Sequence, residues 1–250
     1  AGGQPRGQPH PPPAVSRAAA ELGGVRASPN IWEHPETYER ENLAFDRDRR
    51  IEETIGALHP YAEAHLLDIG CGTGFHLPEF VSRGARVIGV EPHPPLARLA
   101  AERLAARRVA AAVLIGAAQA MPLPDRSIDI VHARWAYFFG PGCEPGLREV
   151  ARVLRPGGVA VIVDNDATTS TFGGWFARFH PAYDPLAVER FWRRAGFERH
   201  RLELAWECAS RTELEALVRI EFTPAAADVI LAEHSGTSVD YAVNLWWRRR

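Results

Sequence analysis

The feature that most constrains the fold of this chain is a glycine-rich loop that directly follows a short apolar stretch. The segment LLDIGCGTG occupies residues 66–74, with glycines at Gly70, Gly72 and Gly74. Because glycine has no Cβ, such a turn lets a ligand lie against bare main chain. A helix that starts after the turn points its free N-terminal amides at the same ligand. The sequence therefore predicts a ligand-binding turn between a strand and a helix of an α/β sheet.

The residues after this turn continue the alternation of apolar strands and helices, which indicates a parallel sheet with right-handed crossovers. Residues 199–207 and 239–245 then show the alternating pattern of two further strands. We expect a doubly wound, Rossmann-like α/β fold around a mostly parallel seven-stranded sheet. The five earlier strands are expected at residues 66–69, 86–90, 113–115, 128–132 and 159–163.

The segment before the sheet is expected to form a tail and a lid. Residues 1–27 are rich in Pro and Gly and are predicted to be a flexible tail. Residues 28–60 are predicted to form an N-terminal helical lid, with one helical stretch over 35–58 that ends before Pro60.

Residues 61–250 are expected to form the α/β domain, with a C-terminal helical and aromatic cap inserted in it. The insertion is expected at about residues 167–198 and to be irregular up to residue 184. Further helices are expected within residues 210–234, where Ser210 and Glu213 form a capping box.

The composition excludes several kinds of catalytic site. The chain of 250 residues contains no lysine, so all 29 of its basic Lys and Arg side chains are arginine. A Walker P-loop and a Schiff-base enzyme both require lysine. The three cysteines are far apart and form no CxxC pair. We therefore expect neither a disulfide framework nor a bound metal.

Charge and hydropathy bear on the partners and the location of the protein. The formal net charge is −2, which makes a nucleic-acid partner unlikely, because phosphates select a basic surface. No apolar run approaches the roughly 20 residues that a membrane helix needs. The first residues lack the apolar core of a signal peptide. These features predict a soluble cytoplasmic protein without a membrane partner.

An acidic residue stands where the second strand ends. Glu91 lies 23 residues after Asp68, at a position where a carboxylate can accept hydrogen bonds from both hydroxyls of an adenosine ribose. This spacing fits both S-adenosylmethionine and NAD. The glycines form GxGxG rather than the GxGxxG of dinucleotide sites, and Asp68 stands where it can face a cationic amino group. Both details favour S-adenosylmethionine, and an NAD-dependent oxidoreductase remains an alternative.

Four segments resemble, in order, the motifs of the class I S-adenosylmethionine-dependent methyltransferases, over about residues 60–165. The resemblance implies S-adenosylmethionine as the cofactor and methyl transfer as the activity. It further implies that Gly70, Cys71, Gly72 and Gly74 line the methionine half of the cofactor. The four segments are LLDIGCGTG, VIGVEP, MPLPDRSIDIVHARWA and REVARVLRPGGVAVI.

The same resemblance assigns residues to the two ends of the cofactor. Asp68 would orient the amino group, and Arg134 would pass beside the sulfonium. Tyr38, in the lid, would close over the methionine carboxylate. Glu91 would hold the ribose hydroxyls, and Pro92 would pack near the adenine.

The adenine end departs from the pattern of the family. Relatives often carry an acidic residue after the glycine that follows the third strand. Here Gly116 is followed by Ala117, Ala118 and Gln119. We therefore expect the adenine to contact backbone groups at Ala118 or the amide of Gln119.

Methyl transfer requires alignment of the acceptor and, for some acceptors, a base that takes a proton. His34, His132 and His180 are the candidates for this base, because histidine changes its charge near neutral pH. Aromatic side chains are expected to form either the wall of an apolar acceptor pocket or the packed core of the cap. These are Trp32, Trp135, Tyr137, Phe138, Trp175 and Tyr183.

The expected acceptor is a small molecule, with a peptide or an aromatic natural product favoured by the aromatic residues. The segment HARWAYFF (residues 132–139) stands where amino-directed DNA methylases carry an NPPY-type loop. An RNA or protein methyltransferase and a non-catalytic S-adenosylmethionine-binding protein remain as alternatives.

Overall fold

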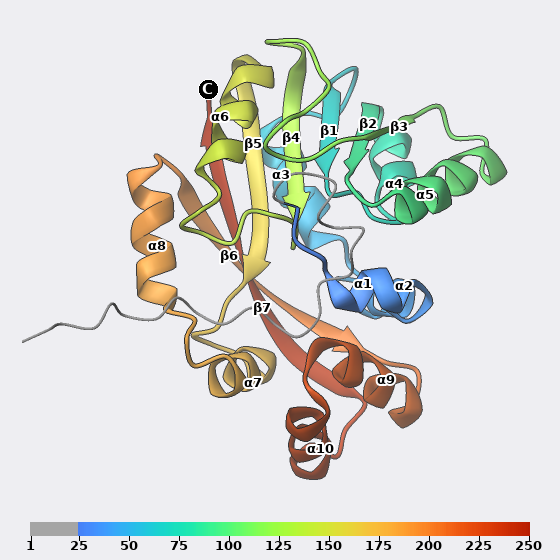
Figure 1. The fold of residues 1–250 in the computed structure, drawn as a ribbon, viewed down its shortest axis with the longest axis vertical. Coiled ribbons are helices and arrows are strands. Elements are labelled where there is room, and N and C mark those ends of the chain that lie inside the picture. The colour runs from blue at the N-terminus through green and yellow to red at the C-terminus, as the bar shows by residue number, and fades with distance from the viewer. Residues whose placement is uncertain (1–24) are drawn as a thin grey trace, which may run out of the picture.

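The computed structural model describes residues 25–250, and one seven-stranded sheet forms its centre (Figure 1). The strands lie in the order β3-β2-β1-β4-β5-β7-β6. This confirms the α/β fold and the number of strands expected from the sequence. The strands are β1 (His65–Ile69), β2 (Arg86–Glu91), β3 (Ala112–Ile115), β4 (Ile128–Arg134), β5 (Leu154–Asn165), β6 (Glu198–Glu207) and β7 (Ser238–Arg249).

The helices described by the structure precede the sheet, connect its strands or cap its last two strands. They are α1 (Pro29–Glu33), α2 (Pro35–Ala44), α3 (Arg50–Leu58), α4 (Leu77–Ser82), α5 (Pro94–Ala106), α6 (Glu144–Val153), α7 (Thr171–Phe179), α8 (Pro185–Arg194), α9 (Arg211–Glu221) and α10 (Pro224–Glu233).

The strand order creates a switch point between β1 and β4. Strands β1 to β5 pair in parallel, and β7 lies antiparallel between β5 and β6. The chain runs from β1 outward to β2 and β3 and then returns to the other side of β1 as β4. In open α/β sheets, ligands bind outside the carboxyl ends of the strands at such a point. The topology thus places the glycine loop after β1 at the expected binding edge.

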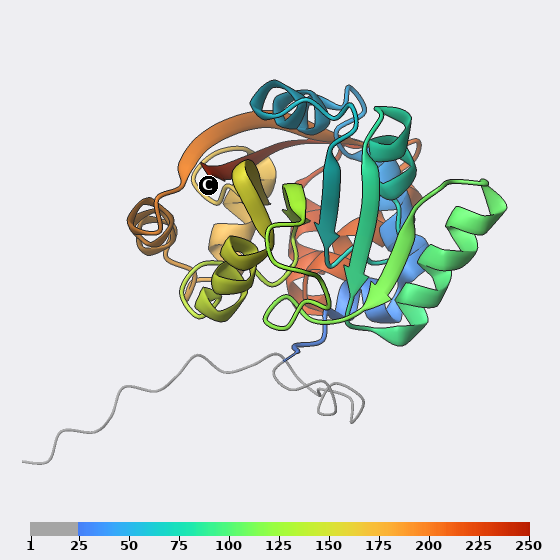
Figure 2. The same cartoon turned by 90° about the horizontal axis from the view of Figure 1, so that it is seen from above.

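The sheet is buried on both faces because neighbouring residues along a strand point to opposite sides. On β1, Leu66 packs in one apolar cluster and Leu67 in the other. Side chains of α3 and α4 join the first cluster, and those of α6 and α8 join the second. Figure 2 shows helices on both sides of the sheet.

The N-terminal lid consists of separate helices, so the single helix expected over residues 35–58 is wrong. The helical conformation is interrupted at residues 45–49, where Asp46 and Arg49 adopt positive φ angles of 47° and 57°. The Asp46 carboxylate accepts hydrogen bonds from the amides of Arg50 and Ile51, at 2.9 and 3.0 Å, and thereby caps α3. This break lets α2 pack against α9 while α3 packs on the sheet.

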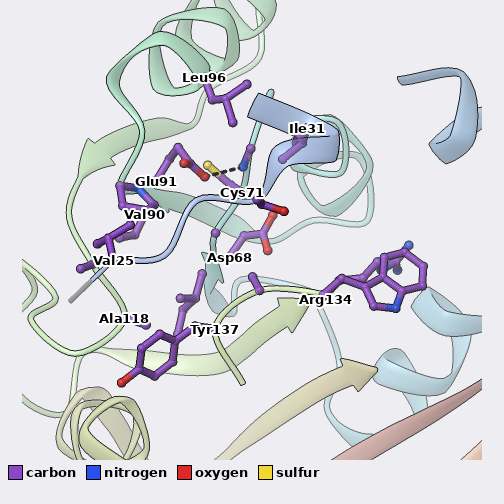
Figure 3. A pocket seen from close by; sticks show the side chains of 18 of the residues that line it. Val25, Ile31, Asp68, Cys71, Val90, Glu91, Leu96, Ala118, Arg134 and Tyr137 are labelled. Atoms are coloured by element: carbon purple, nitrogen blue, oxygen red, sulfur yellow. Dashed lines mark hydrogen bonds between the residues drawn. The ribbon is translucent and has the colours of Figure 1, made fainter. Parts of the chain in front are cut away.

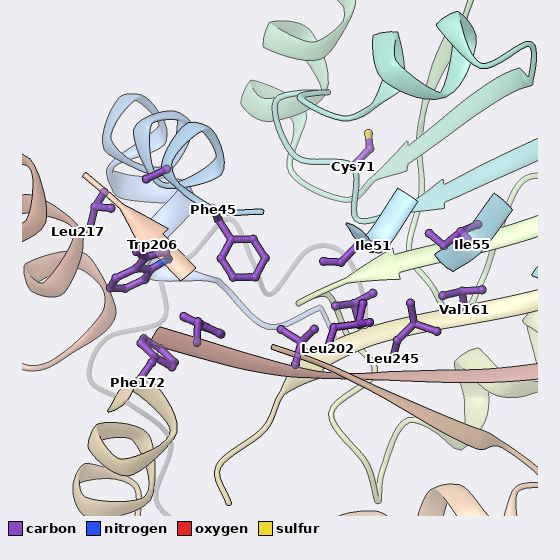
Figure 4. Close-up of a cluster of buried hydrophobic side chains, with 14 of the residues drawn as sticks. Phe45, Ile51, Ile55, Cys71, Val161, Phe172, Leu202, Trp206, Leu217 and Leu245 are labelled. Carbon is purple, nitrogen blue, oxygen red and sulfur yellow. The ribbon is translucent and has the colours of Figure 1, made fainter. Parts of the chain in front are cut away.

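Residues 171–179 form α7, rather than the irregular segment expected from the sequence. The Ser170 hydroxyl accepts a hydrogen bond from the Gly173 amide at 3.1 Å and caps the helix. Phe172 stacks on Tyr241 of β7 with ring centroids 4.0 Å apart. Burial of this aromatic face stabilises a short segment whose small residues give little helical signal. Figure 4 shows Phe172 in a cluster with Trp206 of β6 and Phe45 of the lid.

Candidate functional site

A cavity of about 500 Å³ lies at the carboxyl ends of β1, β2 and β4, at the switch point (Figure 3). Asp68 and the loop after β1 line it, together with Glu91 at the end of β2 and the residues that follow β4. Ile31 and Trp32 of α1 and Tyr38 of α2 line it from the lid. Residues 25–27 also line the cavity, whereas residues 1–24 of the predicted tail lie outside the described residues.

Two of the loop glycines lie where a side chain would collide with a neighbouring residue. Gly70 and Gly72 have φ angles of +70° and +55°, which disfavour any other residue. A Cβ on Gly70 would lie 2.5 Å from the Cβ of Ala136, and a Cβ on Gly72 would lie 2.6 Å from the Cδ1 of Ile31. Bare main chain is therefore required where the loop meets the segment after β4 and the lid.

Gly74 has a different surrounding from the other two glycines. It does not line the cavity, and a Cβ there would lie 2.9 Å from the Cβ of Ala100 in α5. The structure thus gives Gly74 a packing role between the loop and α5. Cys71, in contrast, lines the cavity as expected.

Glu91 is fixed by the main chain at the end of β2. Its Oε2 accepts a hydrogen bond from the Gly72 amide and its Oε1 one from the His93 amide, both at 2.9 Å. The side chain is only 3% exposed. Burial raises the pKa of Glu91 to about 7, although the two amide hydrogen bonds act in the opposite direction. The carboxylate is therefore preorganised to accept hydrogen bonds from a diol in the cavity.

Asp68 lies directly across from His132 on the neighbouring strand. The register pairs the two residues, and His132 Nδ1 lies 2.7 Å from Asp68 Oδ1. Both residues line the cavity, but the His132 ring is fully buried. Its Nε2 has no hydrogen-bond partner within the described part of the chain. This ring therefore holds Asp68 and has no access to an acceptor.

Arg134 lines the cavity as expected, and its guanidinium is bound to neighbouring side chains. Its Nη2 donates to Glu52 Oε1 of α3 at 2.7 Å, and its Nη1 lies 3.3 Å from His76 Nε2. Burial by itself would raise the pKa of Glu52, but the Arg134 guanidinium brings this pKa below its usual value. Burial and the same guanidinium lower the pKa of His76 well below its usual value. The four side chains of Glu52, His76, Arg134 and the neighbouring His132 form a buried polar group beneath the cavity.

The other two histidines named from the sequence lie away from the cavity. His34 is exposed between α1 and α2. His180 follows α7 and packs on Phe176 with ring centroids 4.5 Å apart, and its burial lowers its pKa. Neither residue lines the cavity. Of the three candidates, only His132 lines the cavity, where its ring is fully buried and bonded to Asp68.

The structure divides the expected aromatic wall into two groups. Trp32, Trp135 and Tyr137 line the cavity. The other three do not: Phe138 is buried in the core, Trp175 packs on Phe222 and Tyr183 packs on Phe176. Trp135 and Tyr137 have positive φ angles of 47° and 57°, which are uncommon for bulky residues and mark backbone held under constraint.

The remaining residues expected at the cofactor line the cavity. Pro92, Ala118 and Gln119 lie on the side of β2 and β3, and Tyr38 lies on the lid side. Burial is the main cause that raises the pKa of the Tyr38 phenol, followed by the carboxylates of Glu41 and Glu221. Tyr38 is therefore a hydrogen-bond donor at neutral pH.

Several cavity residues were not found by the sequence reasoning. They include Ile31, Asn42 and His76. His76 lies in the predicted turn-to-helix segment, and its position just after the glycines already indicates that it can line the cavity. The lid residues carry no such signal, because their place depends on how α1 and α2 fold over the sheet. Glu52, the partner of Arg134, is likewise visible only in three dimensions.

Comparisons with known proteins agree with this geometry. The family model described as "Methyltransferase domain" matches residues 67–162, which hold the glycine loop, Glu91 and the segment after β4. This segment is similar to the methyltransferase domain of the class I S-adenosylmethionine-dependent methyltransferases. The cofactor of this methyltransferase domain is S-adenosylmethionine. The match supports S-adenosylmethionine over the nicotinamide cofactor of the alternative NAD-dependent oxidoreductase.

The proteins similar to this chain include named enzymes and solved structures. A sterol 4-C-methyltransferase of Caenorhabditis elegans is 30% identical over 126 residues, which cover 46% of this chain and 38% of that protein. The chain thus spans less than half the length of this relative. A solved S-adenosylmethionine-dependent methyltransferase of Aquifex aeolicus matches this chain with a TM-score of 0.55 at 15% sequence identity. The match covers 85% of this chain and 97% of the Aquifex chain.

A third similar protein was solved with its cofactor. Phosphoethanolamine N-methyltransferase 2 of Haemonchus contortus, in complex with S-adenosyl-L-methionine, has a TM-score of 0.57 at 17% identity, covering 90% of this chain and 60% of its own. Structural similarity at such a low sequence identity shows the fold of this chain and no more. Within residues 25–250, no helix is long and apolar enough to cross a membrane. The same residues contain no cluster of His, Cys, Asp or Glu side chains that could hold a metal ion.

Proposed function

We propose that this methyltransferase domain transfers a methyl group from S-adenosylmethionine to a small-molecule acceptor. The observation that carries the proposal is the meeting of Glu91, Asp68 and the bare loop main chain in one cavity at the switch point of the sheet. A Cβ on Gly70 would collide with Ala136 and one on Gly72 with Ile31, so the loop meets these neighbours with bare main chain. These residues fit an adenosyl group with a cationic amino end.

The proposed roles follow from the chemistry of each side chain. The Glu91 carboxylate accepts hydrogen bonds from the ribose hydroxyls, and Asp68 accepts one from the amino group. Pro92 and Ala118 provide apolar contact for the adenine. Ile31 of the lid excludes water by covering Gly72.

Bound S-adenosylmethionine supplies an activated methyl group, so the protein mainly needs to align the acceptor with it. The acceptor would enter beside Trp135 and Tyr137, which line the cavity after β4. We assign no histidine as a base, because His34 and His180 lie outside the cavity and His132 is sealed by its neighbours. Acceptors whose nucleophile forms without a base from the protein therefore fit best, and weakly basic amines and thiols belong to this class.

The shape of the site favours a small acceptor rather than a polymeric one. The cavity of about 500 Å³ lies beneath α1 and α2 and falls in the size range of small-molecule pockets. The nematode relative is named for a sterol acceptor, which is also a small molecule. The net charge of −2 gives the chain no overall positive charge to attract RNA.

The test combines binding and turnover. Calorimetry with S-adenosylhomocysteine and NAD should show binding of the first only. A labelled-methyl assay with amines, thiols, phenols and alcohols should then find an acceptor, with short RNA and peptides as comparison. No binding of S-adenosylhomocysteine would refute the proposal. Binding without transfer to any acceptor class would favour a non-catalytic binding protein, and transfer only to RNA or peptides would refute the small-molecule acceptor.

A further inference from the structure

The pair formed by Asp68 and His132 has a geometry that a packing role alone does not require. The two residues stand opposite each other on parallel strands β1 and β4, and a hydrogen bond of 2.7 Å joins them. Asp68 is 3% exposed and His132 is fully buried. A carboxylate only accepts hydrogen bonds, so the imidazole donates from Nδ1. The hydrogen bond therefore has one direction, from His132 to Asp68.

The surroundings of His132 fix the ring in this orientation. The ring of Phe80 in α4 packs edge-on against it with centroids 5.1 Å apart. The ring of His76 lies 6.3 Å away on another side. Because these aromatic rings enclose the imidazole, its Nδ1 stays directed at Asp68 Oδ1.

Only one Asp68 oxygen is engaged by this contact. Oδ1 accepts from His132, and Asp68 itself lines the cavity, where Figure 3 draws its carboxylate among the other lining residues. An aspartate rotates about its side-chain bonds unless a partner holds it. The donor behind Asp68 thus selects the rotation in which the other oxygen serves the cavity.

We propose that His132 is a positioning residue that acts through Asp68 and sets the affinity of the site for the amino end of the cofactor. This inference rests on the proposed function, because it takes Asp68 to accept a hydrogen bond from the ammonium group of S-adenosylmethionine. His132 then contacts no substrate and transfers no proton. Its contribution is confined to the methionine half of the cofactor, since Glu91 holds the ribose independently.

Two ligands separate this role from a general effect on the fold. S-adenosylhomocysteine carries the amino group, whereas 5′-methylthioadenosine has the same adenosine and thioether without the amino acid. Calorimetry with both ligands should be performed on the wild-type chain, His132→Leu, His132→Gln and His132→Asn. Leucine removes the donor, glutamine places its amide nearer to the position of Nε2, and asparagine places its amide near that of Nδ1.

The proposal predicts a selective loss. His132→Leu and His132→Gln should weaken the affinity for S-adenosylhomocysteine about tenfold, as expected for a hydrogen bond to a charged group. Their affinity for 5′-methylthioadenosine should stay within about twofold of the wild-type value. His132→Asn should restore most of the lost affinity. In an Asp68→Asn background, His132→Leu should cause little further loss, because the two residues act as one unit.

Two results would overturn the inference. Equal losses for both ligands would show a structural role, and unchanged S-adenosylhomocysteine affinity in His132→Gln would show that Asp68 needs no partner. If His132→Leu does not fold, the comparison of His132→Gln with His132→Asn gives the same decision. Failure of the wild-type chain to bind S-adenosylhomocysteine would instead refute the proposed function itself.

Discussion

The indole of Trp32 lies parallel to the imidazole of His93, with ring centroids 4.0 Å apart and an angle of 14° between the planes. Trp32 belongs to the lid helix α1, and His93 follows Glu91 at the end of β2. The stack therefore joins the lid to the turn that carries Glu91, the acid proposed to bind the ribose. It closes the rim of the cavity over the position proposed for the adenosine.

Loss of this stack should open the rim. We expect Trp32→Ala to raise the dissociation rate of S-adenosylhomocysteine about two- to tenfold, in line with the 0.5–1.5 kcal/mol of an aromatic pair. Stopped-flow fluorescence measures this rate. Trp247→Ala is the matched control, because Trp247 stacks on His200 with centroids 6.0 Å apart and lies outside the cavity lining. Equal rates in the wild type and Trp32→Ala would show that the lid does not retain the ligand.

Removal of the Glu91 carboxylate, which is proposed to bind the ribose, should weaken binding of the cofactor. Glu91→Ala is expected to lose about 1–3 kcal/mol of binding free energy, the usual range for hydrogen bonds to a charged group. Calorimetry with S-adenosylhomocysteine measures the loss, and Glu102→Ala on the exposed face of α5 serves as the control. An unchanged affinity in Glu91→Ala would mean that the ribose lies elsewhere.

The raised pKa of Glu91 makes binding depend on pH. Burial raises this pKa from 4.5 to about 7 in the free protein, and ribose hydroxyls that donate to the carboxylate favour its ionised form. Binding therefore releases a proton below pH 7. Affinity should fall as the pH decreases from 7 toward 5 and stay level above 7. The dependence should be absent in Glu91→Gln, and its persistence there would assign it to another group.

The buried ion pair beneath the cavity should matter more for folding than the ion pairs on the surface. Glu52→Gln leaves the Arg134 guanidinium buried with its charge uncompensated, which costs about 3–5 kcal/mol in comparable pairs. The side chains of Arg178 and Glu233 are 51% and 55% exposed, so Glu233→Gln should cost less than about 1 kcal/mol. Urea unfolding compares the two variants. Similar small losses would show that water reaches Arg134.

Two glycine variants separate the cost of a steric clash at the loop from the cost of backbone strain. Gly70→Ala and Gly157→Ala share a left-handed backbone, with φ angles of +70° and +83°, and each should cost about 1–2 kcal/mol for that reason. The new Cβ at position 70 would also meet Ala136 at 2.5 Å, whereas position 157 is open. Gly70→Ala should therefore lose about 1–3 kcal/mol more free energy of unfolding. Equal losses by chemical denaturation would contradict the close approach.

The central part of the site was predictable because it is local in sequence. A glycine loop after a strand fixes where bare main chain occurs, and an acid at the end of the next strand lies beside it by the parallel geometry of the sheet. Glu91, Cys71 and Pro92 follow from that geometry and line the cavity. Gly74 followed the same motif, but its neighbour Ala100 in α5 gives it a packing role.

The sequence alone determined the alternation of strands and helices, and with it the α/β sheet and the edge where the cofactor would bind. The tertiary structure alone decided which side chains meet across that edge. It paired His132 with Asp68, joined Arg134 to Glu52 and kept Trp175 and Tyr183 out of the cavity. The physical reason is that periodicity reports which residues are buried on one element, whereas a contact between elements depends on how distant segments pack around a shared core.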